Sequence, residues 1–133
     1  MTVFADSHYY SALFNRQDPA HARAVEFSRT FRGKMVTTAW VLTEVADGMA
    51  GPYDRDVFVR FFDELRIDPD VKFIAASSEL FDEGIVLYRG RSDKDWSLTD
   101  CISFVVMSRE NLTEALTGDR HFHQAGFHAL LMP

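Results

Sequence analysis

Four acidic residues in this chain occupy positions from which carboxylates can act together. Asp6 directly follows Val3-Phe4-Ala5, an apolar run typical of a short buried strand, and Asp119 follows the strand-like run 114–117 after a single glycine. Glu44 and Asp100 each fall near the start of an expected helix. Residues just beyond the carboxyl ends of parallel strands line the ligand crevice of open α/β sheets, so we expect the four side chains to share one pocket.

Such a pocket predicts a divalent metal ion. Two carboxylates about 4 Å apart repel each other by roughly 4 kcal/mol at an effective dielectric near 20, so clustered acids must take up protons or bind a cation. Ligands that are all oxygen atoms suit Mg²⁺ or Mn²⁺ rather than zinc. A water activated by that ion can attack a phosphodiester, and the ion can stabilise the charge that develops. The residue types therefore indicate metal-dependent phosphodiester hydrolysis.

Each acid also has a purely structural interpretation. Asp100 lies three residues after Ser97, the spacing of a capping box, and Asp119 suits a helix N-cap. Glu44 taken alone is an ordinary surface residue of a helix. Asp6 is the hardest to explain by packing, because an unpaired carboxylate is costly to bury at the end of an apolar strand. The joint placement of the four acids is the argument for a site.

The chain alternates short β-type runs with helical patterns, which indicates one α/β domain over residues 1–133, built on a parallel sheet. Strands are expected at 3–6, 35–38, 71–74, 114–117 and 127–131. Helices are expected at 7–14, 19–31, about 40–49, 53–66 and 78–88, then from Ser97 through about Met107, and briefly around His121. Pro19 is expected at the first helical position of the second helix.

The composition excludes several classes of protein. No apolar stretch approaches about eighteen residues, so we expect no membrane span. The N-terminus lacks the basic start and long apolar run of a secretory signal. The single cysteine, Cys101, lies in an apolar run and can neither form an internal disulfide nor build a zinc cluster. These features predict a protein of the reducing cytoplasm.

The net charge of −6 is unevenly distributed along the chain. Residues 47–83 hold ten acids and four bases, whereas the rest of the chain holds ten of each. Local charge decides whether phosphates can approach a protein, and metal binding by four of the remaining acids would leave the surface outside 47–83 positive. Two basic groups are candidates to guide an RNA backbone. They are Arg16, Arg23, Arg29, Arg32 and Lys34, and the loop residues Arg89, Arg91 and Lys94.

Four stretches of the chain resemble the PIN-domain family, and within it the VapC-like toxins of bacterial toxin–antitoxin pairs. They are Phe4–Ser7, Thr38–Glu44, Asp93–Cys101 and Leu116–Phe127. The four acids stand in the family's order, and the part from residue 93 to residue 127 is the most specific. Residues 47–83 match no motif of the family and leave the choice of target open.

That resemblance implies a three-layer α/β/α sandwich with a central parallel sheet, and Mg²⁺- or Mn²⁺-dependent endonucleolytic cleavage of RNA. It implies a cognate antitoxin as protein partner and a homodimer. Ser7 and Thr117 match hydroxyl positions beside the acids, and Asp93 is either an auxiliary acid of the site or a loop residue paired with Lys94. The catalytic metal ligands that it implies are Asp6, Glu44, Asp100 and Asp119.

Two other classes of function stay open on the sequence. One is a PIN-like binding module or inactive scaffold controlled by a protein partner. The other is a phosphohydrolase with an aspartate nucleophile, although the sequence after Asp6 lacks a second aspartate two residues later. His121 and His123 are spaced so that they face apart on a helix, which argues against a pair of histidine metal ligands. Arg120 or His121 is a candidate contact to a substrate phosphate.

Overall fold

The computed structural model describes residues 1–133 and places five strands in one sheet. They are β1 (Thr2–Ala5), β2 (Lys34–Thr38), β3 (Val71–Ile74), β4 (Glu114–Leu116) and β5 (His128–Ala129), in the spatial order β3-β2-β1-β4-β5. Every neighbouring pair is parallel. The order of the strands changes direction between β1 and β4, and a crevice forms at the carboxyl ends of strands at such a point.

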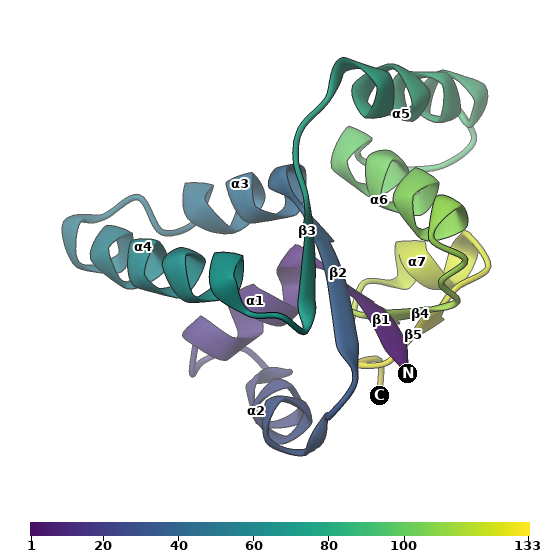
Figure 1. Ribbon diagram of the computed structural model, residues 1–133. Coiled ribbons are helices and arrows are strands. Elements are labelled where there is room, and N and C mark those ends of the chain that lie inside the picture. Colours follow the sequence, from purple (N-terminus) through teal and green to yellow (C-terminus); the bar gives the residue numbers. More distant parts are fainter.

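Seven helices cover the two faces of this sheet. They are α1 (Ser7–Phe14), α2 (His21–Thr30), α3 (Ala39–Asp47), α4 (Pro52–Ile67), α5 (Ser78–Gly90), α6 (Leu98–Arg109) and α7 (Arg120–Gln124). Figure 1 shows α1 to α4 on one side of the sheet and α6 and α7 on the other, with α5 packed on α6. The predicted three-layer α/β/α sandwich with a central parallel sheet is confirmed.

The core is densest around the central strand. Val3, Phe4 and Ala5 of β1 have no exposed surface, because β1 is hydrogen-bonded on both edges and covered on both faces. α6 is apolar almost all round and buries most of its length, since it lies between the sheet and α5. No helix combines the length and the apolar character needed to cross a membrane.

A glycine lets α5 approach α6 closely. A Cβ built on Gly84 would lie 2.3 Å from Cγ1 of Ile102, a fully buried residue of α6. Real Cβ atoms essentially never come so close to another carbon. Gly84 is therefore needed for packing and not for backbone conformation, because it lies inside a helix.

Most predicted bounds differ from the observed ones by one or two residues, and two of the differences have a visible cause. The helix expected to open at Pro19 begins at His21, because Asp18 forms a turn in which its Oδ1 accepts the N–H of Ala20 at 2.8 Å and its carbonyl accepts the N–H of His21. The strand expected at 127–131 is reduced to His128–Ala129, because a turn in which Met132 N–H donates to Ala129 O follows it directly.

Candidate active site

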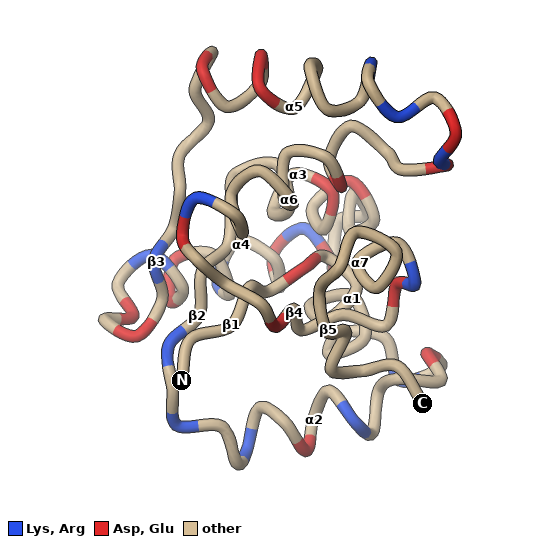
Figure 2. The backbone as a smooth tube through the Cα atoms, turned by 90° about the vertical axis from the view of Figure 1, so that its right-hand side faces the viewer, with Lys and Arg blue, Asp and Glu red and all other residues tan.

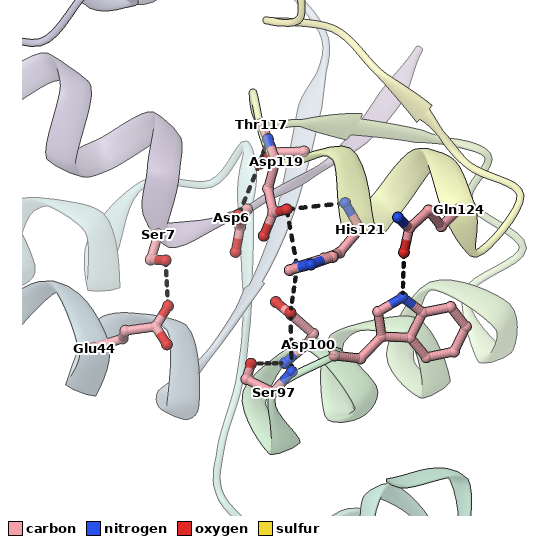
Figure 3. A network of polar contacts seen from close by, with 10 residues as sticks. Asp6, Ser7, Glu44, Ser97, Asp100, Thr117, Asp119, His121 and Gln124 are labelled. Carbon is pink, nitrogen blue, oxygen red and sulfur yellow. Dashed lines mark hydrogen bonds and ion pairs between the residues drawn. The ribbon is translucent and has the colours of Figure 1, made fainter. Parts of the chain in front are cut away.

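An open pocket of about 830 Å³ lies beyond the carboxyl ends of the central strands, and its lining contains no hydrophobic residue. Its acidic lining residues are Asp6, Glu44, Asp95, Asp100 and Asp119. The four acids singled out by sequence therefore meet in one place, as predicted. Figure 3 shows them reaching the pocket from different elements: from the end of β1, from α3, from α6 and from the start of α7. We call this hollow the acidic pocket.

Asp6 is the most buried acid of the pocket, with 3% of its surface exposed. Its backbone N–H donates to Leu116 O at 3.3 Å, which holds it beside β4, and its Oδ2 accepts a hydrogen bond of 2.8 Å from Thr117 Oγ1. The pKa of Asp6 rises from 3.8 to about 7, mainly because of burial; the Thr117 hydrogen bond opposes the rise, and the charges of Asp100 and Glu44 add to it.

Thr117 connects two of the acids. While its hydroxyl donates to Asp6, the same oxygen accepts the backbone N–H of Asp119 at 3.0 Å. The side chain is fully buried, so these bonds are shielded from water. The hydroxyl that the family resemblance places beside the acids thus orients the carboxylate of Asp6 and the backbone that carries Asp119.

Asp100 forms the capping box considered for it from sequence and also faces the acidic pocket. Its backbone N–H donates to Ser97 Oγ at 3.0 Å while its Oδ2 accepts the N–H of Ser97 at 3.2 Å, which completes a capping box at the start of α6. The same carboxylate lines the acidic pocket. Burial, followed by the charge of Asp119, raises the pKa of Asp100.

Asp119 is the N-cap of α7 and lies beside a histidine. Its Oδ1 accepts the N–H of His121 at 2.9 Å. The ring Nδ1 of His121 lies 3.0 Å from Asp119 Oδ1 and 3.4 Å from Asp100 Oδ2, yet this buried atom makes no hydrogen bond of good geometry. One ligand atom from each of these residues lies within 4.8 Å of the others. Phe122, fully buried against Phe4, anchors α7 and so holds this group in position.

Glu44 faces the other acids from the opposite wall of the pocket (Figure 3). It extends from α3 and is exposed, and Ser7 Oγ at the start of α1 donates a hydrogen bond to its Oε1. Ser7, the second hydroxyl position implied by the family resemblance, thus orients a carboxylate as Thr117 does. Asp6 and Glu44 lie outside the tight group formed by Asp100, Asp119 and His121.

Gly118 allows a histidine to close one side of the pocket. Its backbone N–H donates to Nδ1 of His8 at 3.1 Å, and a Cβ at this position would lie 2.6 Å from Cε1 of the same ring. The absence of a side chain at Gly118, between Thr117 and Asp119 in the chain, therefore leaves room for the ring of His8. His8 also lines the acidic pocket.

Asp93 lies outside the acidic pocket. Its carboxylate accepts two hydrogen bonds of 3.0 Å, from Nε and Nη2 of Arg91, and its partner is therefore Arg91 and not Lys94. The hydrogen bond from Arg91 is the main reason that the pKa of Asp93 falls to about 2. The structure places this acid among the residues of the loop between α5 and α6.

Sequence reasoning did not single out His8, Ser11 or Asp95, which line the pocket, and it named His121 only as a candidate contact to a substrate phosphate. The expectation that His121 and His123 face apart is confirmed in outline, since His121 faces the acids and His123 is exposed. The missed signal was that His121 follows an N-cap aspartate by two residues, within the first turn of α7. No comparable local pattern marks His8 or Asp95.

Comparisons with solved structures agree with this fold. VapC20 of Mycobacterium tuberculosis, described as a sarcin–ricin loop cleaving toxin, has a TM-score of 0.83 at 22% identity over 94% of this chain and 95% of its own. VapBC2 of Rickettsia felis, bound to a DNA fragment from its promoter, has a TM-score of 0.65 at 12% identity over 97% of each chain. FitAcB of Neisseria gonorrhoeae has a TM-score of 0.65 at 14% identity over 97% and 95%.

A search of curated proteins returns no significant match. The family model described as the PIN domain matches residues 3–128, nearly the whole chain, and so includes all the acids of the pocket. This chain therefore belongs to the PIN domain family.

Proposed function

We propose that this PIN domain is a divalent-cation-dependent endoribonuclease and the toxin of a VapBC-type toxin–antitoxin pair. The observation that carries the proposal is the convergence of Asp6, Glu44, Asp100 and Asp119 in one pocket with no hydrophobic lining. The fold likeness to a toxin described as cleaving the sarcin–ricin loop supports RNA as the substrate, and the likeness to VapBC2 supports a cognate antitoxin as partner. A homodimer is proposed from the family resemblance.

The donor set of the pocket fits a divalent cation. Burial and mutual repulsion raise the pKa of both Asp6 and Asp100, which means that their ionised forms lack a compensating positive charge. The buried Nδ1 of His121 lacks a hydrogen bond although two carboxylates lie beside it. A cation bound among Asp6, Asp100, Asp119 and His121 would compensate the carboxylate charges and give Nδ1 of His121 a partner. Such a cation would act as a Lewis acid toward the phosphodiester and would lower the pKa of a water.

The residues of the chain then divide the remaining work. Thr117 keeps the carboxylate of Asp6 in one orientation, and the capping box does the same for Asp100. Glu44, exposed on the opposite wall and oriented by Ser7, is placed to accept a proton from an attacking water. Arg120, at the rim of the same pocket, is placed to contact the phosphate that is cleaved.

His121 favours Mn²⁺ over Mg²⁺ as the working ion. Mg²⁺ is a hard cation that takes oxygen ligands, whereas imidazole is a ligand of transition metals. His121→Asn should therefore weaken Mn²⁺ binding about tenfold or more and change Mg²⁺ binding little. Calorimetric titration of each ion into both proteins measures this without any nuclease assay. Equal weakening for the two ions would remove His121 from the ligand set.

Activity itself is tested by mapping RNA ends after expression of the wild type, Asp6→Asn and a matched control, Asp63→Asn. Asp63 is an exposed residue of α4 outside the acidic pocket, so the control makes the same chemical change elsewhere. We expect new RNA ends with the wild type and with Asp63→Asn, and none with Asp6→Asn. Cleavage that survives in folded Asp6→Asn would contradict the proposed site, and absence of cleavage in all three would favour a PIN-like binding module.

A further inference from the structure

The acidic pocket repels the substrate that it is proposed to cleave. Its lining holds five carboxylates against one guanidinium, Arg120, which leaves a formal charge of −4 with histidines neutral. A bound divalent cation offsets only part of this charge. A polyanion approaches such a site when positive groups adjoin it, because the local potential governs approach. The structure should therefore hold cationic side chains next to the acidic pocket.

A second hollow, of about 740 Å³, adjoins the acidic pocket and is basic. Asp95 and Ser97 line both hollows, so the two lie side by side. Its lining comes almost entirely from the end of α5 and the loop that follows, and it includes Arg89, Arg91 and Lys94. We call this hollow the basic groove. These three side chains and Arg120 are all the Lys and Arg residues that line the two hollows.

Arg91 is held in a defined orientation within the basic groove. Asp93 accepts two hydrogen bonds from its guanidinium, and the guanidinium carbon lies 4.9 Å from the centre of the Trp96 ring. Trp96 is buried, and its Nε1 donates to Gln124 Oε1 at 3.1 Å. The loop is thereby tied to α7, the helix that carries His121. Arg89 and Lys94 make no ion pair, so their charges are available to a ligand.

The other basic group named from the sequence lies elsewhere. Arg29 is in the last turn of α2, and Lys34 is the first residue of β2, at the amino end of a strand whose carboxyl end faces the acidic pocket. Figure 2 shows the bases of α2 along the lower edge of the molecule and those after α5 at the upper right. None of the five residues of this other group (Arg16, Arg23, Arg29, Arg32 and Lys34) lines either hollow. The structure thus places only one of the two basic groups beside the acidic pocket, a difference that the sequence could not show.

We propose that the basic groove is the subsite for the RNA backbone next to the phosphate that is cleaved, with Arg89, Arg91 and Lys94 as phosphate contacts. Asp93 is a positioning residue: it holds the Nε–Nη2 edge of Arg91 and leaves the planar Nη1–Nη2 edge free for phosphate oxygens, in a way that an ammonium group cannot reproduce. This inference rests on the proposed ribonuclease function and adds to it the path of the strand. It also gives Asp93 a role that does not involve metal.

The test measures RNA binding without cleavage. Proteins carrying Asp6→Asn are titrated with a fluorescein-labelled oligouridylate at several NaCl concentrations and constant Mn²⁺, and fluorescence anisotropy gives Kd. To this background we add Arg89→Gln with Lys94→Gln, or, as a control of equal charge change, Arg29→Gln with Lys34→Gln. Loss of two phosphate contacts should reduce the slope of log Kd against log salt by about 1.4, whereas the control keeps its slope.

Arg91→Lys separates orientation from charge. The substitution keeps the positive charge but loses the fork and its pairing with Asp93, so Kd should rise about threefold to tenfold at every salt concentration while the slope stays unchanged. Asp93→Asn should raise Kd in the same way. The combination to look for is a raised Kd with an unchanged salt slope, in variants whose circular dichroism and thermal melting match the parent. A merely electrostatic or purely structural role of Arg91 would not produce it.

The outcomes separate this inference from the proposed function. If the wild type cleaves RNA but both double variants give the same slope of log Kd against log salt, the assignment of the basic groove is wrong and the proposed ribonuclease function is unaffected. If the wild type cleaves no RNA, the proposed function fails first, and the anisotropy data then show independently whether the groove holds a polyanion.

Discussion

Replacement of the buried acid Asp6 by asparagine should stabilise the protein in the absence of divalent cations, and the gain should depend on pH. Asp6 is almost fully buried, and its ionised form is opposed by burial and by the charges of Asp100 and Glu44. Asparagine has nearly the same shape and can still accept the hydrogen bond from Thr117 through its carbonyl oxygen. It carries no charge at any pH, so it imitates the protonated acid.

The magnitude follows from the pKa of Asp6, which is about 7 in the folded protein against 3.8 for the free side chain. This difference corresponds to a cost of about 4 kcal/mol for holding the ionised form in the folded state. Between these two pKa values the folded protein binds a proton that the unfolded chain has released. The contribution of Asp6 to stability is therefore complete below pH 3.8, falls by about 1.4 kcal/mol per pH unit as the pH rises, and levels off above pH 7.

The assay is urea unfolding of wild type and Asp6→Asn in EDTA at several pH values. Taking the difference between the two proteins cancels the titration of groups far from the site. The advantage of the variant should grow by roughly 2 kcal/mol between pH 5 and pH 7 and level off above pH 7. Added Mn²⁺ should make the wild type the more stable of the two proteins. The ion stabilises the wild type by mass action, whereas the variant lacks one of the ligands and binds the ion less tightly.

Asp63→Asn provides the matched control for the same chemical change. Asp63 is exposed on α4, so its substitution should shift stability equally at every pH. A difference between wild type and Asp6→Asn that does not change between pH 5 and pH 8 would refute the reasoning. It would mean that Asp6 is ionised in the folded protein at no cost, and the carboxylates would then need no cation.

Other substitutions test the packing and hydrogen bonds that support the pocket. Gly84→Ala should destabilise the protein by about 1–3 kcal/mol in urea unfolding because its Cβ meets Ile102, whereas Gly90→Ala, with nothing within 4 Å of its Cβ, should be neutral or slightly stabilising. Ser97→Ala should cost about 1 kcal/mol through loss of the capping box, read as a lower urea midpoint with an unchanged slope. Thr117→Val should cost about 1–3 kcal/mol and raise the pKa of Asp6 further, followed by NMR titration of the carboxyl carbon.

Most of the fold could be predicted because local patterns carry the relevant physics. The run Val3-Phe4-Ala5 is apolar without alternation because β1 is the central strand and is covered on both faces, and such strands are typical of parallel sheets. Ser97 and Asp100 predict a helix start because a capping box depends only on residues three apart. The errors fall at positions such as Pro19, where a turn closed by Asp18 competes with the start of a helix.

The acids of the pocket could be predicted for a related reason. Asp6, Asp100 and Asp119 lie at a strand end or a helix start, and Glu44 lies in the second turn of α3. Parallel topology brings such positions to one edge of the sheet, so their meeting could be expected without any knowledge of side-chain contacts. The hydrogen bond between Thr117 and Asp6 carries no such local mark. Thr117 and Asp6 are 111 residues apart, and only the pairing of β1 with β4 makes them neighbours.

His121 shows where this kind of reasoning stops. Its spacing from His123 is the feature visible in the sequence, and that spacing predicts that the two rings face apart, as they do. The ring nevertheless lies between Asp119 and Asp100, because Phe122 packs against Phe4 and sets the rotation of α7. The rotation of this five-residue helix depends on the buried contacts of Phe122 with Phe4 and Phe104. The chemical character of the site, all oxygen or oxygen with one nitrogen, depends in turn on that rotation. The proposed preference for Mn²⁺ therefore depends on core packing in this protein as much as on its acidic residues.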